Sequence, residues 1–198
     1  MQKETIAMRV VNFISRIDES RCSGCKRCEL VCPPSAITVT DQIARVDAAH
    51  CLACNKCWHL CPEDAVSIVP RDEELIVGVD FEAVEPDAIE SLCQKAHFFP
   101  EQFICACTLT LAREVAAAII MGAKTPEAVT AMTGVRSGCA IYCMSPVLRM
   151  LRAHGVEVDS PPDNRWYNLS LSLWDVPADI AENHPGYYLK EDKIEFDG

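Results

Sequence analysis

Eight of the thirteen cysteines stand in two groups of identical spacing, and this pattern carries the clearest chemistry in the chain. Each group reads Cys-x2-Cys-x2-Cys-x3-Cys-Pro, and the second repeats the first at one constant offset. The eight positions are Cys22, Cys25, Cys28 and Cys32, which recur as Cys51, Cys54, Cys57 and Cys61. Three thiolates on one tight loop bind three corners of an iron–sulfur cube, and the fourth is placed to reach the other cube.

The spacing therefore predicts two [4Fe-4S] sites that exchange their fourth ligand. We expect the first site to use Cys22, Cys25, Cys28 and Cys61, and the second to use Cys51, Cys54, Cys57 and Cys32. Zinc is the alternative, but zinc ribbons usually carry two Cys-x2-Cys pairs with a long spacer. His50 and His59 lie near these loops. Because cysteine fills all eight ligand positions, we expect both histidines to be solvated or hydrogen-bonded.

Four further cysteines form two close pairs, Cys105-x-Cys107 and Cys139-x3-Cys143, with a long helical segment expected between them. Zinc, mononuclear iron and a [2Fe-2S] cluster all accept four thiolates, so spacing alone does not choose between them. Cys143 precedes a helix expected to start at Ser145-Pro146. The dipole of that helix would favour an anionic cluster.

Cys93 is the thirteenth cysteine, and it stands four residues before His97. This spacing places both side chains on one face of a predicted helix. Two further ligands for a metal are not evident, so we predict a buried structural cysteine.

The two large cysteine groups belong to a tandem repeat from Arg16 to Val69. Each unit has a β segment, a cysteine loop, a turn of helix and a second β segment. The segments leaving the loops, Ile37–Val39 and Val66–Ile68, alternate apolar and polar residues as half-buried strands do.

Residues typical of helix starts and helix ends predict the elements that follow the repeat. The connector, residues 71–103, is acidic and has an expected strand at 75–79 and an expected helix at 86–97. Residues 104–158 should form three helices: one over 111–119 that stops at Gly122, one between Thr125-Pro126 and Gly134, and one from Ser145-Pro146 to Gly155.

The tail, residues 159–198, is acidic and rich in aromatic residues. We expect a strand at 169–173, a hairpin over 187–196 that turns at Glu191-Asp192, and otherwise irregular structure. Its aromatic side chains pack on the protein itself or form a docking arm for a partner subunit, and the first reading is favoured. These aromatic residues are Trp166, Tyr167, Trp174, Tyr187, Tyr188 and Phe196.

Both complete motifs make residues 10–70 resemble the bacterial-type ferredoxins with two [4Fe-4S] clusters. This resemblance implies a pseudo-twofold βαβ fold that passes single electrons. The expected chain is then an α+β protein with a ferredoxin domain at 1–70, the acidic connector at 71–103, a small helical domain at 104–158 and the aromatic tail.

Residues 104–155 resemble the bacterioferritin-associated ferredoxin-like [2Fe-2S] domain. The resemblance implies a helix–turn–helix fold that holds one [2Fe-2S] cluster and that occurs fused to or partnered with flavin-dependent dehydrogenases. This chain departs from the stand-alone members in having three residues, rather than two, between its final cysteines. The matching residues are Cys105-Ala106-Cys107, Glu114-Val115, Gly122-Ala123-Lys124-Thr125, Thr133-Gly134, Ser137-Gly138-Cys139 and Cys143.

The composition and the absence of several motifs argue against some classes of function. The net charge of −11 argues against nucleic acid and anionic lipid and indicates a basic partner surface. No nucleotide-binding glycine loop, phosphate loop or His-Glu-x-x-His helix is present. No apolar run suits a membrane span and no secretory signal is visible, so we expect a cytoplasmic protein.

These features predict an electron-transfer protein without a catalytic site of its own. We expect it to be the small relay subunit of a larger oxidoreductase, partnered by an amine, amino-acid or opine-type flavin dehydrogenase or by another anaerobic reductase complex. The alternative is a metal-handling or redox-sensing module that delivers or senses iron or copper at residues 105–143.

Overall fold

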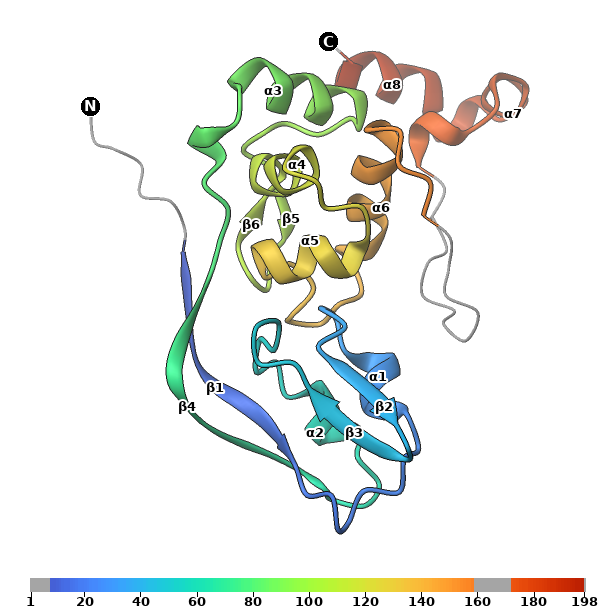
Figure 1. The fold of residues 1–198 in the computed structure, drawn as a ribbon. Helices are drawn as coiled ribbons and strands as arrows, with labels where there is room; N and C mark the ends of the chain where they lie inside the picture. The colour runs from blue at the N-terminus through green and yellow to red at the C-terminus, as the bar shows by residue number, and fades with distance from the viewer. Residues whose placement is uncertain (1–7, 159–171, 198) are drawn as a thin grey trace. The chain divides into compact units, whose positions relative to one another are not determined.

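The computed structural model describes residues 8–158 and 172–197 (Figure 1). Strand β1 (Arg9–Ile17) pairs antiparallel with β4 (Val66–Val77), and β2 (Ile37–Thr40) pairs antiparallel with β3 (Ile43–Val46). Strand β1, which enters the first cysteine loop, thus pairs with β4, which leaves the second loop. Strand β2, which leaves the first loop, pairs with β3, which enters the second loop. This crossed pairing brings each loop beside the end of the other.

The two units share their local geometry. Each cysteine loop ends in one turn of helix, α1 (Arg27–Val31) or α2 (Lys56–Leu60). The residues before these helices, Lys26 and Asn55, both have left-handed backbone, with φ of 62° and 64°. Left-handed backbone recurs at equivalent positions of the two units in the pairs Gly24 and Ala53, and Ser35 and Asp64. The sequence repeat is therefore also a repeat of backbone conformation.

The apolar core around these loops is small. Its buried members are Ile37, Ala44, Cys57 and Val66. The side chains packed around them include four more cysteines, Cys22, Cys28, Cys32 and Cys61. Cysteine side chains therefore supply a large share of the interior of this part of the chain.

A larger core joins the helices that follow: α3 (Pro86–Lys95), α4 (Ala112–Ile120), α5 (Pro126–Thr133) and α6 (Met144–Ala153). Helix α4 contacts the other three, and it carries small side chains that allow close approach, since Ala112 and Ala116–Ala118 are fully buried (Figure 1). A short turn, η1 (Phe81–Ala83), and a small hairpin, β5 (Phe103–Cys105) with β6 (Thr110–Leu111), complete this part.

The predicted helices of this region are confirmed with small shifts at their ends. Thr125 accepts a hydrogen bond from the backbone N–H of Ala128 and caps α5, which ends at Gly134 with φ of 74°. Helix α6 starts at Met144, one residue before the expected Ser145. The strand expected at 75–79 is the end of β4, which stops at Val77.

The expected helix at 86–97 is α3, which ends at Lys95. His97 has a left-handed backbone with φ of 59°, so the prediction that Cys93 and His97 share one helix face is wrong. Cys93 itself is fully buried in the helical core, as predicted.

Backbone contacts divide the chain into a unit of residues 1–167 and a second unit of residues 168–198. The described part of the second unit contains η2 (Leu173–Asp175), α7 (Ala178–Asn183), η3 (Pro185–Tyr187) and α8 (Leu189–Asp197). Over residues 172–197 the expectation of irregular structure is therefore wrong, and so is that of a hairpin over 187–196. Glu191 and Asp192, the predicted turn, lie in the first turn of α8, where acidic residues favour a helix.

Side-chain contacts fix α8 within this unit. Lys193 Nζ donates to the carbonyl of Val176 at 3.0 Å, and Lys190 lies 3.1 Å from Glu182. Most of the strand expected at 169–173 lies outside the described residues, as do Trp166, Tyr167 and the side chain of Phe196.

Tyr187 and Tyr188 are 73% and 64% exposed, so these two do not pack against the protein as expected, whereas Trp174 is half-buried. Among the described residues, the chain has no helix with the length and apolar character needed to cross a membrane.

Candidate iron–sulfur sites

The first predicted ligand set gathers around one small cavity. Cys22, Cys25 and Cys28 come from the first loop, and Cys61 arrives from the end of α2 in the second unit. All four line the same cavity together with Gly24 and Lys26. The crossed strand pairing is the cause, because β4 leaves Cys61 and pairs with β1, which leads into the first loop.

The second predicted set gathers in the same way. Burial raises the pKa of the Cys32 thiol to about 12, and the neighbouring sulfurs of Cys54, Cys51 and Cys57 add to that rise. Cys32 therefore lies among the three cysteines of the second loop.

Backbone N–H groups point at the sulfur atoms in both sites. The N–H of Ala36 donates to Cys32 Sγ at 3.2 Å, and the N–H of Ala65 donates to Cys61 Sγ at 3.3 Å. These two contacts occupy equivalent positions of the repeat. N–H donors stabilise the negative charge of iron-bound thiolates and help to set the reduction potential of a cluster.

Ser15 is a site residue that sequence reasoning missed. Its hydroxyl is buried and hydrogen-bonds Cys57 Sγ at 3.2 Å, and the Cys51 thiol donates to it at 3.7 Å. The equivalent position in the first site is Ala44, which contributes only its backbone N–H, to Cys22 Sγ at 3.5 Å. Comparing the two repeats position by position, one strand before the loops, would have found this difference.

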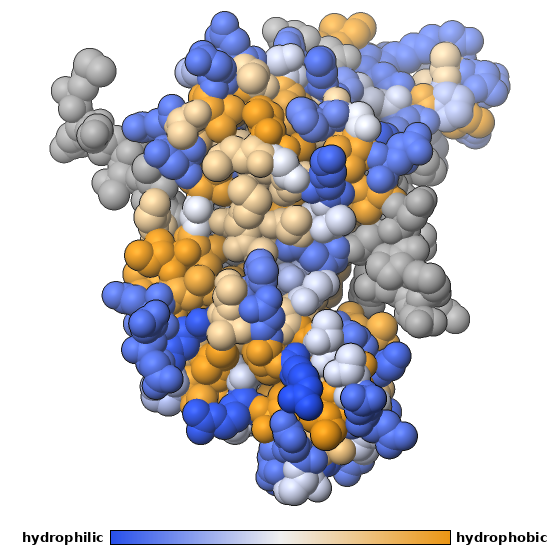
Figure 2. Space-filling view, viewed as in Figure 1, coloured by the Kyte–Doolittle hydropathy of each residue, from blue (hydrophilic) through white to orange (hydrophobic). Residues whose placement is uncertain are grey.

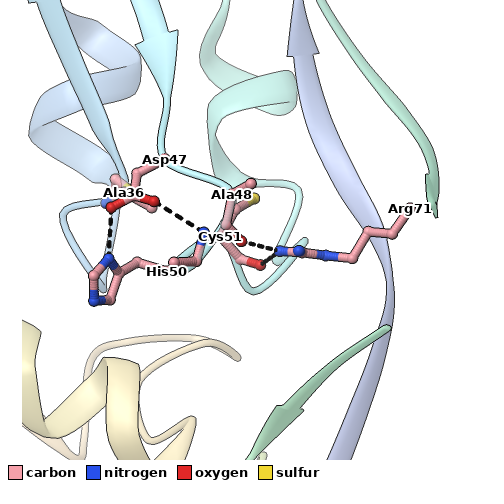
Figure 3. A network of polar contacts seen from close by, with 8 residues as sticks. Ala36, Asp47, Ala48, His50, Cys51 and Arg71 are labelled. Carbon is pink, nitrogen blue, oxygen red and sulfur yellow. Dashed lines mark hydrogen bonds and ion pairs between the residues drawn. The ribbon is translucent and has the colours of Figure 1, made fainter. Parts of the chain in front are cut away.

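Arg71 of β4 hydrogen-bonds the backbone of the second cysteine loop (Figure 3). Its Nη2 atom donates to the carbonyl oxygens of Ala48 at 2.7 Å and Cys51 at 2.6 Å. Asp47 accepts a hydrogen bond from His50 Nδ1 at 2.6 Å, and this bond lowers the pKa of Asp47. His50 is thus hydrogen-bonded, as predicted.

The other loop histidine, His59, is exposed and lies against the Trp58 ring, with ring centroids 4.9 Å apart.

Burial makes several thiols of these sites harder to ionise than an ordinary thiol. Burial raises the pKa of Cys28 to about 11 and also raises the pKa of Cys54 and Cys57. Only thiolates bind iron, so loading these sites releases protons.

The remaining four cysteines come together between the loops of the helical part. The thiols of Cys105 and Cys143 hydrogen-bond each other, and Cys107 and Cys139 form a second contact. Each contact joins one cysteine of the Cys105-x-Cys107 pair to one cysteine of the Cys139-x3-Cys143 pair. Cys105 and Cys143 are buried, whereas Cys107 and Cys139 are exposed. Two adjacent pairs of thiols suit a [2Fe-2S] cluster, in which each iron takes two.

The electrostatics of this third group favour negative charge. Burial opposes ionisation of Cys105, but hydrogen bonds from the Thr108 hydroxyl and the Arg136 N–H outweigh it and lower its pKa. The backbone N–H groups of Ile141 and Tyr142 lower the pKa of Cys139. Cys143, the N-cap of α6, is the exception, because burial and the neighbouring sulfurs of Cys105 and Cys139 raise the pKa of its thiol to about 12.

Gly138 lies so close to Cys107 that a side chain at this position would collide with it. A Cβ at this position would stand 2.3 Å from Cys107 Cβ and 3.1 Å from its sulfur. The absent side chain allows the Cys139 loop to approach Cys107 closely.

Within residues 8–158 and 172–197, no three His, Cys, Asp or Glu side chains are gathered closely enough to hold a single metal ion. Cysteines that bind a cluster surround several irons rather than one.

Cysteine loops that direct sulfur and N–H groups inward, joined to a helical four-cysteine segment, are the features of an iron–sulfur protein. Residues 15–69 match the family model of the 4Fe-4S dicluster domain, and residues 103–153 match that of the BFD-like [2Fe-2S] binding domain. The chain thus contains both iron–sulfur domains that the sequence resembles. Among curated proteins no match is found.

Proposed function

We propose that the chain is an electron-transfer subunit that holds two [4Fe-4S] clusters and one [2Fe-2S] cluster. The ligands would be the sets Cys22, Cys25, Cys28 and Cys61; Cys51, Cys54, Cys57 and Cys32; and Cys105, Cys107, Cys139 and Cys143. The observation that carries this proposal is the single cavity that Cys22, Cys25 and Cys28 of the first loop line together with Cys61 of the second unit. Bound clusters of these types supply one-electron redox chemistry.

The residues around the sulfurs suit that role. The N–H groups of Ala36 and Ala65 donate to ligand sulfurs, the Ser15 hydroxyl hydrogen-bonds Cys57 Sγ, and buried apolar residues such as Val66 limit the access of water.

We further propose a flavoprotein dehydrogenase or reductase with a basic docking surface as the partner. Apolar and hydrophilic patches alternate on the face seen in Figure 2. Ile141 and Tyr142 stand between Cys139 and Cys143 and are 67% and 86% exposed. Exposed aromatic and aliphatic side chains next to a redox site are suited to transient docking.

Iron analysis of anaerobically purified protein tests the proposal. We expect about ten irons per chain, together with paramagnetic signals of interacting [4Fe-4S] clusters and of a [2Fe-2S] cluster. The Cys139→Ser variant should lose about two of these irons and only the [2Fe-2S] signal. About eight irons with one zinc would refute the [2Fe-2S] assignment.

Co-purification separates this role from metal handling. A stoichiometric flavoprotein partner supports the relay subunit. A chain without such a partner that transfers iron or copper to an acceptor protein would contradict it.

A further inference from the structure

The loop of the second cysteine motif contacts the segment that carries the last four cysteines. Lys56, between Cys54 and Cys57, donates a hydrogen bond from Nζ to the carbonyl of Gly138, the residue before Cys139. The contact spans 82 residues of sequence and joins one predicted ligand loop directly to another.

A second contact joins the same two groups. Arg136 Nη1 lies 3.4 Å from the carbonyl oxygen of Pro33, which directly follows Cys32. The backbone N–H of Arg136 hydrogen-bonds the sulfur of Cys105. Arg136 is 6% exposed and also pairs with Glu127 at 3.1 Å, so its position is well fixed.

Lys56 brings one positive charge to both ligand groups. It stands between Cys54 and Cys57 in the chain, and its ammonium reaches the carbonyl of the residue before Cys139. A cation in this position stabilises negative charge on either group.

The first loop offers a matched comparison. Arg27 is the counterpart of Lys56 in the first repeat unit, stands between Cys25 and Cys28, and is exposed to solvent. It carries the same charge at the equivalent position of the other unit, beside the ligand set formed by Cys22, Cys25, Cys28 and Cys61.

We infer that Lys56 is a positioning residue shared by the second [4Fe-4S] site and the [2Fe-2S] site, and that these two sites are neighbours in the relay. The inference rests on the proposed function. A reduced cluster carries one more negative charge than an oxidised one, so a nearby ammonium stabilises the reduced form at either site. Lys56 thus raises the reduction potentials of two centres held in different domains.

Redox titration of the complete, cluster-loaded protein tests this inference. In Lys56→Met, we expect the midpoint potentials of one [4Fe-4S] cluster and of the [2Fe-2S] cluster to fall together, while the iron content stays at the wild-type value. Lys56→Arg keeps the charge and should restore both potentials. Arg27→Met should lower the potential of a [4Fe-4S] cluster and leave that of the [2Fe-2S] cluster unchanged.

The inference is overturned if Lys56→Met leaves the [2Fe-2S] potential unchanged, or if Arg27→Met shifts it equally. A wild-type protein without clusters would instead remove the proposed function itself, so the two failures are distinguishable.

Electron spin relaxation provides a second measurement that leaves Lys56 intact. A neighbouring paramagnet speeds the relaxation of the reduced [2Fe-2S] signal. We expect slower relaxation in Cys54→Ser, which disrupts the second site, and wild-type relaxation in Cys25→Ser, which disrupts the first. The opposite pattern would place the first site beside the [2Fe-2S] site and overturn the inference.

Discussion

Cys93 is the one cysteine of the chain that belongs to none of the three predicted ligand sets. It is fully buried in the helical core, in the same apolar cluster as Ile89 and Leu92. Burial raises the pKa of its thiol to about 11, with the nearby carboxylates of Glu101 and Glu90 adding to the rise. The residue is therefore held as a neutral, small apolar side chain.

The Cys93→Ser variant should be less stable because serine places a more polar hydroxyl in this core. We expect a loss of about 1–3 kcal/mol in the free energy of unfolding. Urea denaturation monitored by circular dichroism measures the loss. Cys93→Ala serves as the control that tests for loss of volume alone. A fall in iron content would show instead that Cys93 is a ligand.

The same thiol gives a pH dependence whose sign follows from its raised pKa. The folded state binds the proton more tightly than the unfolded state, so this contribution is complete below the ordinary value of 9.0. It is lost as the pH rises toward about 11. Alkylation of Cys93 in the folded protein should accordingly be slow at neutral pH.

Among the secondary-structure elements, the two one-turn helices and their loops depend on close backbone contacts. Gly24 has φ of 67°, and a Cβ there would stand 2.6 Å from the Cα of Gln42. The equivalent residue of the second loop is Ala53, which adopts φ of 49° with a side chain present. Closeness to Gln42, more than backbone conformation, therefore requires glycine in the first loop.

The Gly24→Ala variant should disrupt the first loop and lose about four irons per chain. Ala53→Gly is the matched control at the equivalent position, and we expect it to keep the full iron content. Iron analysis and the paramagnetic spectrum of each variant decide the matter. Equal iron in the two variants would contradict a steric role for Gly24.

Elements with local signals could be predicted from the sequence. The N-cap Thr125, Pro126 and the left-handed Gly134 fix α5 within a few residues of sequence, and the alternation at 37–39 marks β2. The tail lacked such signals. Its aromatic residues suggested strands, but contacts of Lys190 and Lys193 with Glu182 and Val176 accompany helix α8 there.

At the scale of the whole molecule, sequence spacing predicted the cysteine sets, and the structure brings their members together. It did not predict how the two cluster domains meet. The contacts of Lys56 with Gly138 and of Arg136 with Pro33 join residues 82 and 103 positions apart. No sequence motif connects the two residues of either contact, so only the tertiary structure reveals these contacts.

The two cluster domains should respond differently to the removal of iron. Residues 15–69 have a small apolar core in which cysteines take a large share, whereas α3 to α6 share an extensive core. Ligand sets that form only in the folded chain couple metal binding to folding. We therefore expect chelation to unfold the first region and to leave the helices folded.

Hydrogen exchange before and after anaerobic chelation measures this difference. Amides of β2 and β3 should lose protection, and buried amides of α4 should keep it. A chelated protein that retains protection in β2 and β3 would contradict the dependence of this region on its clusters.

The ribbon of β1 and β4 has a consequence for how such a chain arises. Arg9 pairs with Val77 at one end of the ribbon, so the region enclosed by these residues starts and stops at adjacent points. A segment with adjacent ends can be inserted into, or removed from, a longer gene product with little rearrangement of its neighbours. The dicluster domain is in this sense a transferable unit, and its attachment to a second iron–sulfur domain requires no change in its own topology.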